Sequence, residues 1–186
     1  MPMTIARSLA FAVAICAAAT ARADDPASRP ESHNVYFGEL HLHTALSLDS
    51  YIFGNRNGVD AAYQFAEGKP VPLYAGGTKQ LAHPLDFLAV TDHAEYMGEI
   101  ALCTTPGSPV YDGKMCDGVR RSDPAVNQPI VESVNKPERK HVAALCGEDG
   151  ARCREAAKAT WKRIRDAAAR YYRRGKFTTL VGFGYS

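Results

Sequence analysis

Two short segments carry side chains that could bind a metal ion. His41-Leu42-His43 places two imidazoles two residues apart, and Thr91-Asp92-His93 places a carboxylate beside a third imidazole. Imidazole nitrogens and carboxylate oxygens are ligands of zinc, manganese and iron ions. An isolated H-x-H pair is a weak motif, and a single histidine often serves a structural role. The two segments together predict a divalent metal site of the kind that activates water for hydrolysis.

The elements that precede these segments would bring them together. Residues 35–42 and 177–183 have the composition of strands, and the continuous apolar run 85–90 is typical of a strand buried on both faces. Helical patterns over 59–67 and 151–174 lie between these strands, which indicates an α/β fold with a parallel sheet. Because active sites of such folds gather at the carboxyl ends of the strands, we expect the histidines to converge there.

Four further acidic residues lie near the histidines. Asp49 is predicted to be a ligand, although an aspartate after a turn often caps a helix instead. Glu39 and Asp92 are predicted to orient the imidazole N–H groups from outside the ligand shell. Glu95 could be a ligand, an orienting partner or a charge in the first turn of a helix. The other histidines, His33, His83 and His141, are interpreted as surface or structural residues.

The amino terminus has the features of a secretory signal peptide. A charged start, a short apolar stretch and the Ala21-Arg22-Ala23 exit predict cleavage of residues 1–23, followed by a loose lead-in over 24–34. The apolar stretch is too short to span a membrane, and a lipoprotein interpretation of Cys16 is weaker. Cleavage leaves 20 basic against 20 acidic side chains. We therefore expect a periplasmic or secreted chain with neither nucleic-acid nor membrane partners.

Basic residues crowd the predicted helix over 151–174. Ala157, Trp161, Ile164, Ala168 and Tyr171 recur at helical spacing and predict its packed side. The remaining surface carries eight cationic residues: Arg152, Lys158, Lys162, Arg163, Arg165, Arg170, Arg173 and Arg174. We interpret this surface as a solvated outer face, with a patch for anionic partners as the alternative.

Cysteine usage agrees with export. Four cysteines remain after cleavage, and an even number in an oxidising compartment favours two disulfides over a metal site or free thiols. Of the three possible pairings we favour Cys103–Cys116 and Cys146–Cys153, because both close short loops. Zinc binding by these cysteines is less favoured because no C-x-x-C pair is present. Residues 103–150 are interpreted as a long, disulfide-pinned insertion that covers or shapes a site.

Longer strings resemble a known family. HLHT, a downstream aspartate and VTDH resemble the PHP (polymerase and histidinol phosphatase) superfamily of metal-dependent phosphoesterases. YFGELHLHTALSLDSYIFGNR, AAYQFAEGKPV, PLDFLAVTDHAEYMG and KFTTLVGFGYS are similar to its DUF3604 branch. The resemblance implies that residues 35–186 belong to a distorted (β/α)7 barrel that hydrolyses phosphate esters. It also implies that His41 and His43 bind one metal, and that Asp49 and His93 bind another.

The chain departs from the family pattern in two respects. The family has a bridging glutamate at the end of the third strand, whereas this chain has Gly184. Strands that would carry later ligands have no counterpart in the 186 residues, so we expect an amino-terminal part of a barrel with an incomplete site. Two alternatives to an active phosphoesterase remain: a non-catalytic remnant or binding module, and an amidohydrolase-like metal enzyme, which also begins with H-x-H.

Overall fold

A computed structural model describes residues 34–134, 136 and 140–185 of the chain. The chain divides into two units, Met1–Asn34 and Val35–Ser186, and the description below concerns the second unit. The predicted signal peptide, most of the predicted lead-in and His33 lie outside the described residues. Within the described ranges, no helix combines the length and apolarity needed to cross a membrane.

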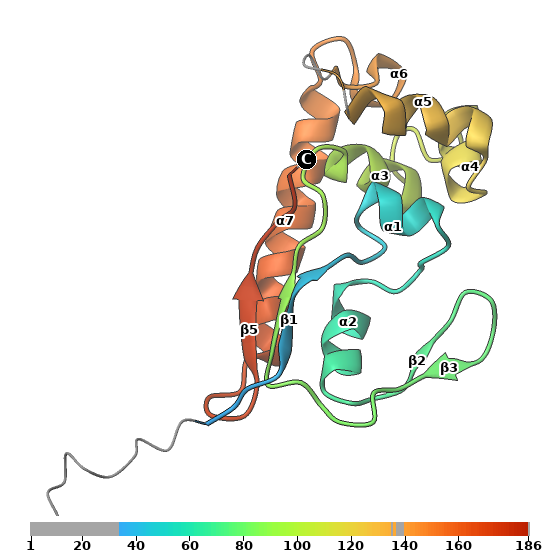
Figure 1. Ribbon diagram of the computed structural model, residues 1–186. Coiled ribbons are helices and arrows are strands. Elements are labelled where there is room, and N and C mark those ends of the chain that lie inside the picture. Colours follow the sequence, from blue (N-terminus) through green and yellow to red (C-terminus); the bar gives the residue numbers. More distant parts are fainter. Residues whose placement is uncertain (1–33, 135, 137–139, 186) are drawn as a thin grey trace, which may run out of the picture. The chain divides into compact units, whose positions relative to one another are not determined.

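Three parallel strands form the sheet that positions the histidines (Figure 1). They are β1 (Gly38–Leu42), β4 (Phe87–Val90) and β5 (Thr178–Val181), in the order β1-β4-β5. The central strand β4 is the continuous apolar run of the sequence, and three of its four residues are buried. Each strand is shorter than expected, but the predicted mixed α/β fold with a parallel sheet is confirmed.

One face of the sheet packs against two helices. α2 (Val59–Ala66) and α7 (Ala151–Tyr171) contribute to a core in which Leu88 and Val90 of β4 are fully buried. The residues predicted for the packed side of α7 contact this core or form part of it. Several of its basic residues pair with acidic side chains, as in Lys158–Glu155, Lys162–Asp166 and Arg170–Asp60. These pairs support the interpretation of a solvated outer face.

The opposite face of the sheet leaves apolar side chains exposed. Since side chains alternate along a strand, Phe87 and Ala89 point away from the helices that bury Leu88 and Val90. Leu180 pairs with Ala89 across the sheet and is 41% exposed. This part of the sheet therefore presents apolar surface that the described residues do not cover.

Residues 103–150, predicted to form a disulfide-pinned insertion, are mostly helical. They contain part of α3 (Met97–Thr104), then α4 (Lys114–Arg120), α5 (Pro124–Val134) and α6 (Ala143–Cys146), as Figure 1 shows. These helices, α1 (Leu48–Ile52) and part of α7 enclose a second apolar core. The sequence patterns did not predict these helices. Helices this short do not sustain a readable hydrophobic period, and disulfides and packing hold them in place.

Both disulfides have the pairing that loop length favoured. Cys103 of α3 bonds to Cys116 of α4, and Cys146 of α6 bonds to Cys153 of α7. All four sulfur-bearing residues are buried within the second core. A two-stranded hairpin completes the described elements, with β2 (Val71–Pro72) antiparallel to β3 (Thr78–Lys79).

A glycine allows α3 to touch α7. A Cβ atom placed on Gly98 would lie 2.1 Å from the carbonyl oxygen of Cys153, far inside van der Waals contact. Only a residue without a side chain permits this approach of the two backbones. The contact fixes Glu99, the next residue along α3, beside the first turn of α7.

Candidate metal centre

The sheet places the two histidine segments next to each other. Leu42 pairs with Val90 across β1 and β4, and the Thr91 amide donates a 2.8 Å hydrogen bond to the Leu42 carbonyl. The residues that follow each strand therefore leave the sheet at the same edge. His43 and His93 meet there, with their ring centroids 4.7 Å apart.

Three of the four predicted ligands form a compact cluster. Asp49 Oδ2 lies 2.8 Å from His43 Nδ1 and 3.7 Å from His93 Nε2. One ligand atom from each of these residues lies within 4.8 Å of the others, a spacing that a single ion could bridge. His41 is exposed and approaches from the other side, with its Nε2 3.1 Å from His43 Nε2.

Two serines hold the Asp49 carboxylate, one through its hydroxyl and one through its backbone amide. Ser47 Oγ donates a 2.6 Å hydrogen bond to Asp49 Oδ1, and the Ser50 amide donates another of 2.6 Å. Ser47 Oγ also accepts a 3.0 Å bond from the His93 amide, so it links two candidate ligands. Burial raises the pKa of Asp49, but hydrogen bonds from Ser47, His43 and Ser50 outweigh it, so the pKa is lowered overall. The carboxylate is thus held in the ionised form that a cation requires.

The hydrogen-bond partners of Asp92 differ from those that the sequence predicts. Its buried carboxylate accepts hydrogen bonds from the Thr44 amide, at 2.5 Å, and from the Thr44 hydroxyl, at 2.8 Å. It fixes the backbone turn directly after His43, whereas the sequence led us to expect a contact with an imidazole nitrogen. Burial raises the pKa of Asp92, and the two bonds from Thr44 only partly offset this effect.

The two glutamates near the histidines also have distinct contacts. Glu39 Oε1 accepts hydrogen bonds of 2.8 Å from the amides of Leu40 and His41, so it supports the end of β1 through backbone groups. Glu95 Oε2 lies 3.5 Å from His93 Nδ1 while Asp49 lies near the other nitrogen of the same ring. Of the predicted orienting residues, Glu95 is thus the one that approaches an imidazole.

Gly184 lies against the cluster. Its amide donates to the Asp92 carbonyl and its carbonyl accepts from the Ala94 amide, each at 3.0 Å. A Cβ atom at this position would lie 3.5 Å from His93 Nδ1 and 3.7 Å from His43 Nε2. A side chain at residue 184 would therefore point between the two imidazoles, where the sequence resemblance expects a glutamate.

The donor set fits a divalent cation. Three imidazoles and a carboxylate are the ligand types of zinc, manganese and iron sites. Sequence reasoning missed Thr44 and Ser47, which position these ligands. Their hydroxyls lie in the turn between His43 and Asp49, and a sequence such as HTALSLD indicates a turn but not the hydrogen-bond partners of its hydroxyls.

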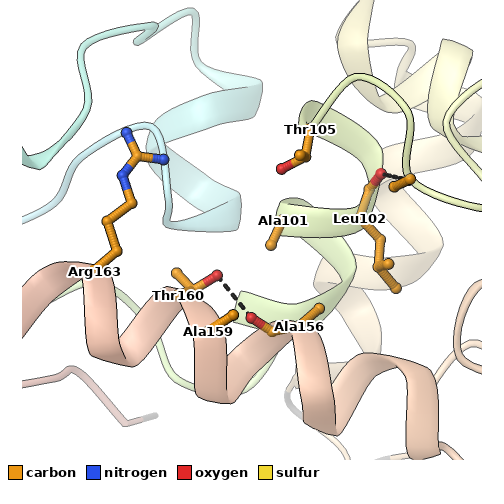
Figure 2. A pocket seen from close by; sticks show the side chains of 8 residues that line it. Ala101, Leu102, Thr105, Ala156, Ala159, Thr160 and Arg163 are labelled. Carbon is orange, nitrogen blue, oxygen red and sulfur yellow. Dashed lines mark hydrogen bonds between the residues drawn. The ribbon is translucent and has the colours of Figure 1, made fainter.

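A pocket lies apart from the histidine cluster. It has a volume of about 270 Å³ and lies between α3 and α7, lined mainly by small residues with Arg163 at one side (Figure 2). Thr160 and Thr105 contribute hydroxyl groups to its wall. Its described lining holds neither carboxylate nor imidazole.

Comparison with known proteins identifies the family of the chain. No curated protein and no solved structure matched the chain. The family model of DUF3604, described as a protein of unknown function, matches residues 30–186, which include the whole sheet and every predicted ligand. The chain belongs to the DUF3604 family.

Proposed function

We propose that the chain is a metal-dependent hydrolase that acts on phosphate esters. One observation carries the proposal: His43 and Asp49 from the segment after β1 meet His93 from the segment after β4, and His41 lies beside His43. Placing imidazoles next to a carboxylate adds little to the stability of the fold. Binding of a metal ion would explain why these side chains are grouped.

The side chains would share the work in a defined way. His43, Asp49 and His93 would hold the ion, and the exposed His41 directs its Nε2 toward the His43 imidazole. A divalent ion supplies Lewis acidity toward water and toward a phosphoryl oxygen. Ser47 would keep Asp49 and the backbone of His93 at a fixed separation. Glu95, beside the second nitrogen of His93, would set the orientation of that ring.

The proposed architecture is the amino-terminal part of a PHP-type (β/α) barrel. Its support is the parallel order of the strands, the placement of candidate ligands at one end, and the exposed apolar face that includes Leu180. In a closed barrel that face would point inward and be filled by side chains of other strands. The proposed location is the periplasm or the extracellular space, because both disulfides suit an oxidising compartment.

An assay with two simple esters tests the proposal. The purified chain, supplied with zinc, manganese or iron, should hydrolyse p-nitrophenyl phosphate or bis(p-nitrophenyl) phosphate. A chelator should abolish the rate, and His93→Ala should lower it by about a hundredfold or more. His83→Ala is the matched control, because His83 is exposed and lies outside the cluster. A folded, metal-loaded chain that hydrolyses neither ester contradicts the proposal.

Gly184 favours one competing function. Without a carboxylate at this position, two cations near His43 and His93 would lack a bridging ligand. A non-catalytic metal-binding product would bind an ion with the same residues but would show no chelator-sensitive hydrolysis. Activity that appears in Gly184→Glu and is absent from the natural chain would support this alternative.

A further inference from the structure

A second cluster of metal-type ligands lies around one disulfide. Glu99 of α3, His141, Cys146 and Cys153 each direct one ligand atom to a common point, and these four atoms lie within 4.8 Å of one another. None of the four belongs to the histidine cluster described above. Glu99, Cys146 and Cys153 are buried, while the His141 side chain is 44% exposed.

Glu99 is incompletely satisfied in this environment. Its Oε1 lies 2.8 Å from His141 Nδ1, and its side chain is 3% exposed. Its buried Oε2 has no hydrogen-bond partner among the described residues. A buried carboxylate oxygen without a partner costs free energy, and a cation at this place would remove that cost.

The disulfide sulfur stands where a ligand would be. Cys146 Sγ lies 3.2 Å from Glu99 Oε1, yet a disulfide sulfur carries no proton to donate. The contact therefore contributes no hydrogen bond in the oxidised chain. After reduction, the same sulfur becomes a thiolate ligand beside a carboxylate and an imidazole.

We propose that the reduced chain binds one zinc-like divalent cation through Glu99, His141, Cys146 and Cys153. Two thiolates, a carboxylate and an imidazole form a four-ligand set suited to tetrahedral zinc. In such a site the sulfur atoms would separate to roughly 3.8 Å, as follows from Zn–S distances of about 2.3 Å and tetrahedral angles. The cysteines lie at the end of α6 and in the first turn of α7, so side-chain rotation can open this gap.

A dithiol can reduce the Cys146–Cys153 disulfide. Two electrons and two protons pass from the dithiol to the S–S bond of Cys146 and Cys153, and the reductant closes its own disulfide. Binding of the cation then displaces the two thiol protons to solvent. In the reverse direction a small-molecule disulfide accepts two electrons from the thiolates and two protons from solvent, the Cys146–Cys153 bond forms and the ion is released. The disulfide and the ion are thus alternative links between α6 and α7.

The exposed ligand provides the route of entry. His141 lines a small pocket of about 150 Å³, together with Lys140 and Tyr185, and this pocket opens to the surface. The backbone of Gly150 lies close to the imidazole, because a Cβ atom there would be 3.1 Å from His141 Cδ2. The exposed imidazole therefore offers an incoming ion its first ligand at the surface.

Cobalt titration of the full chain tests the proposal. Cobalt bound to thiolates gives a sulfur-to-metal charge-transfer band, which the all-nitrogen and oxygen histidine cluster cannot produce. The reduced chain should bind about one equivalent with this band, and the oxidised chain should show none. Glu99→Gln and His141→Ala should each weaken binding by about tenfold or more. Zinc should displace the cobalt.

The other disulfide supplies the matched control. The double variant Cys103→Ser with Cys116→Ser keeps the proposed ligands and should retain the band, whereas Cys146→Ser with Cys153→Ser should lose it. A band that survives in the second variant overturns the proposal, as does a folded reduced chain that binds no cobalt. If reduction unfolds the chain, zinc should restore its helical circular dichroism, and failure to do so also overturns the proposal.

Discussion

The two ligand clusters use similar side chains but are held together in different ways. The histidine cluster is open: hydrogen bonds from Ser47 and Thr44 keep His43, Asp49 and His93 near one another, and no covalent bond joins them. The cysteine cluster is closed by the Cys146–Cys153 disulfide, and most of its atoms are buried. An open cluster gains an ion without losing a bond, whereas a closed one must first be reduced. Ligand type alone therefore does not decide which of the two clusters can take up a metal ion in the oxidised chain.

The largest expected effect concerns the two disulfides. Replacing both cysteines of a pair by serine should lower the free energy of unfolding, by about 2.5 kcal/mol for Cys146–Cys153 and about 3 kcal/mol for Cys103–Cys116, because the second pair closes the longer loop. Urea unfolding of the oxidised chain and both double variants measures these losses. A chelator should not change them. Losses below about 1 kcal/mol, or losses that depend on the chelator, would show that disulfides do not hold this region.

A smaller effect is expected at the open cluster. Gly184→Glu should bind a divalent ion about tenfold more tightly than Gly184→Ala, a difference of about 1.4 kcal/mol, because only the glutamate adds a carboxylate between the imidazoles. Gly184→Ala is the proper control, since a Cβ atom at this position lies 2.9 Å from the Thr91 carbonyl in either variant. Competition with a metal-sensitive dye gives both affinities. Equal affinities would mean that residue 184 does not face the ion.

The smallest effect distinguishes Asp49 of the open cluster from the neighbouring Asp92. The pKa of Asp49 is lowered, so its contribution to stability is present above the ordinary value of 3.8 and is lost as the pH falls through the folded pKa. The pKa of Asp92 is raised by burial, so its unfavourable contribution is relieved as the pH falls toward 3.8. The two carboxylates should therefore respond to acid in opposite directions.

Isosteric variants measure this contrast. Urea unfolding of the metal-free chain, Asp49→Asn and Asp92→Asn should be followed from about pH 6 to about pH 3. The stability of the natural chain relative to Asp49→Asn should fall over this range, and its stability relative to Asp92→Asn should rise. Slopes of the same sign would mean either that the hydrogen bonds of Asp49 do not outweigh its burial, or that burial of Asp92 does not outweigh its bonds from Thr44.

The open cluster could largely be predicted from the sequence. β4 is a continuous apolar run, and a parallel sheet brings the carboxyl ends of its strands to one edge, so His43 and His93 had to approach each other. The position of Asp49 was also anticipated, but the hydroxyls that hold it were not. A hydroxyl in a turn has several possible acceptors, and only the folded backbone selects one.

The closed cluster could be predicted only in part. Loop length favoured the pairing of Cys146 with Cys153, but nothing in the sequence associates Glu99 with His141. Their contact depends on the close approach of α3 and α7 at Gly98, which is a property of tertiary packing. Short helices such as α6 gain their stability from this packing, so local patterns carry little information about them.

Metal content tests the central claim most directly. The purified, oxidised chain should be offered zinc, manganese and iron, separated from free ions and examined by elemental mass spectrometry. We expect about one equivalent or more of metal ion in the natural chain and in His83→Ala, and almost none in His43→Ala or His93→Ala. A natural chain that is folded by circular dichroism but carries no metal would contradict the claim that these residues form a metal centre.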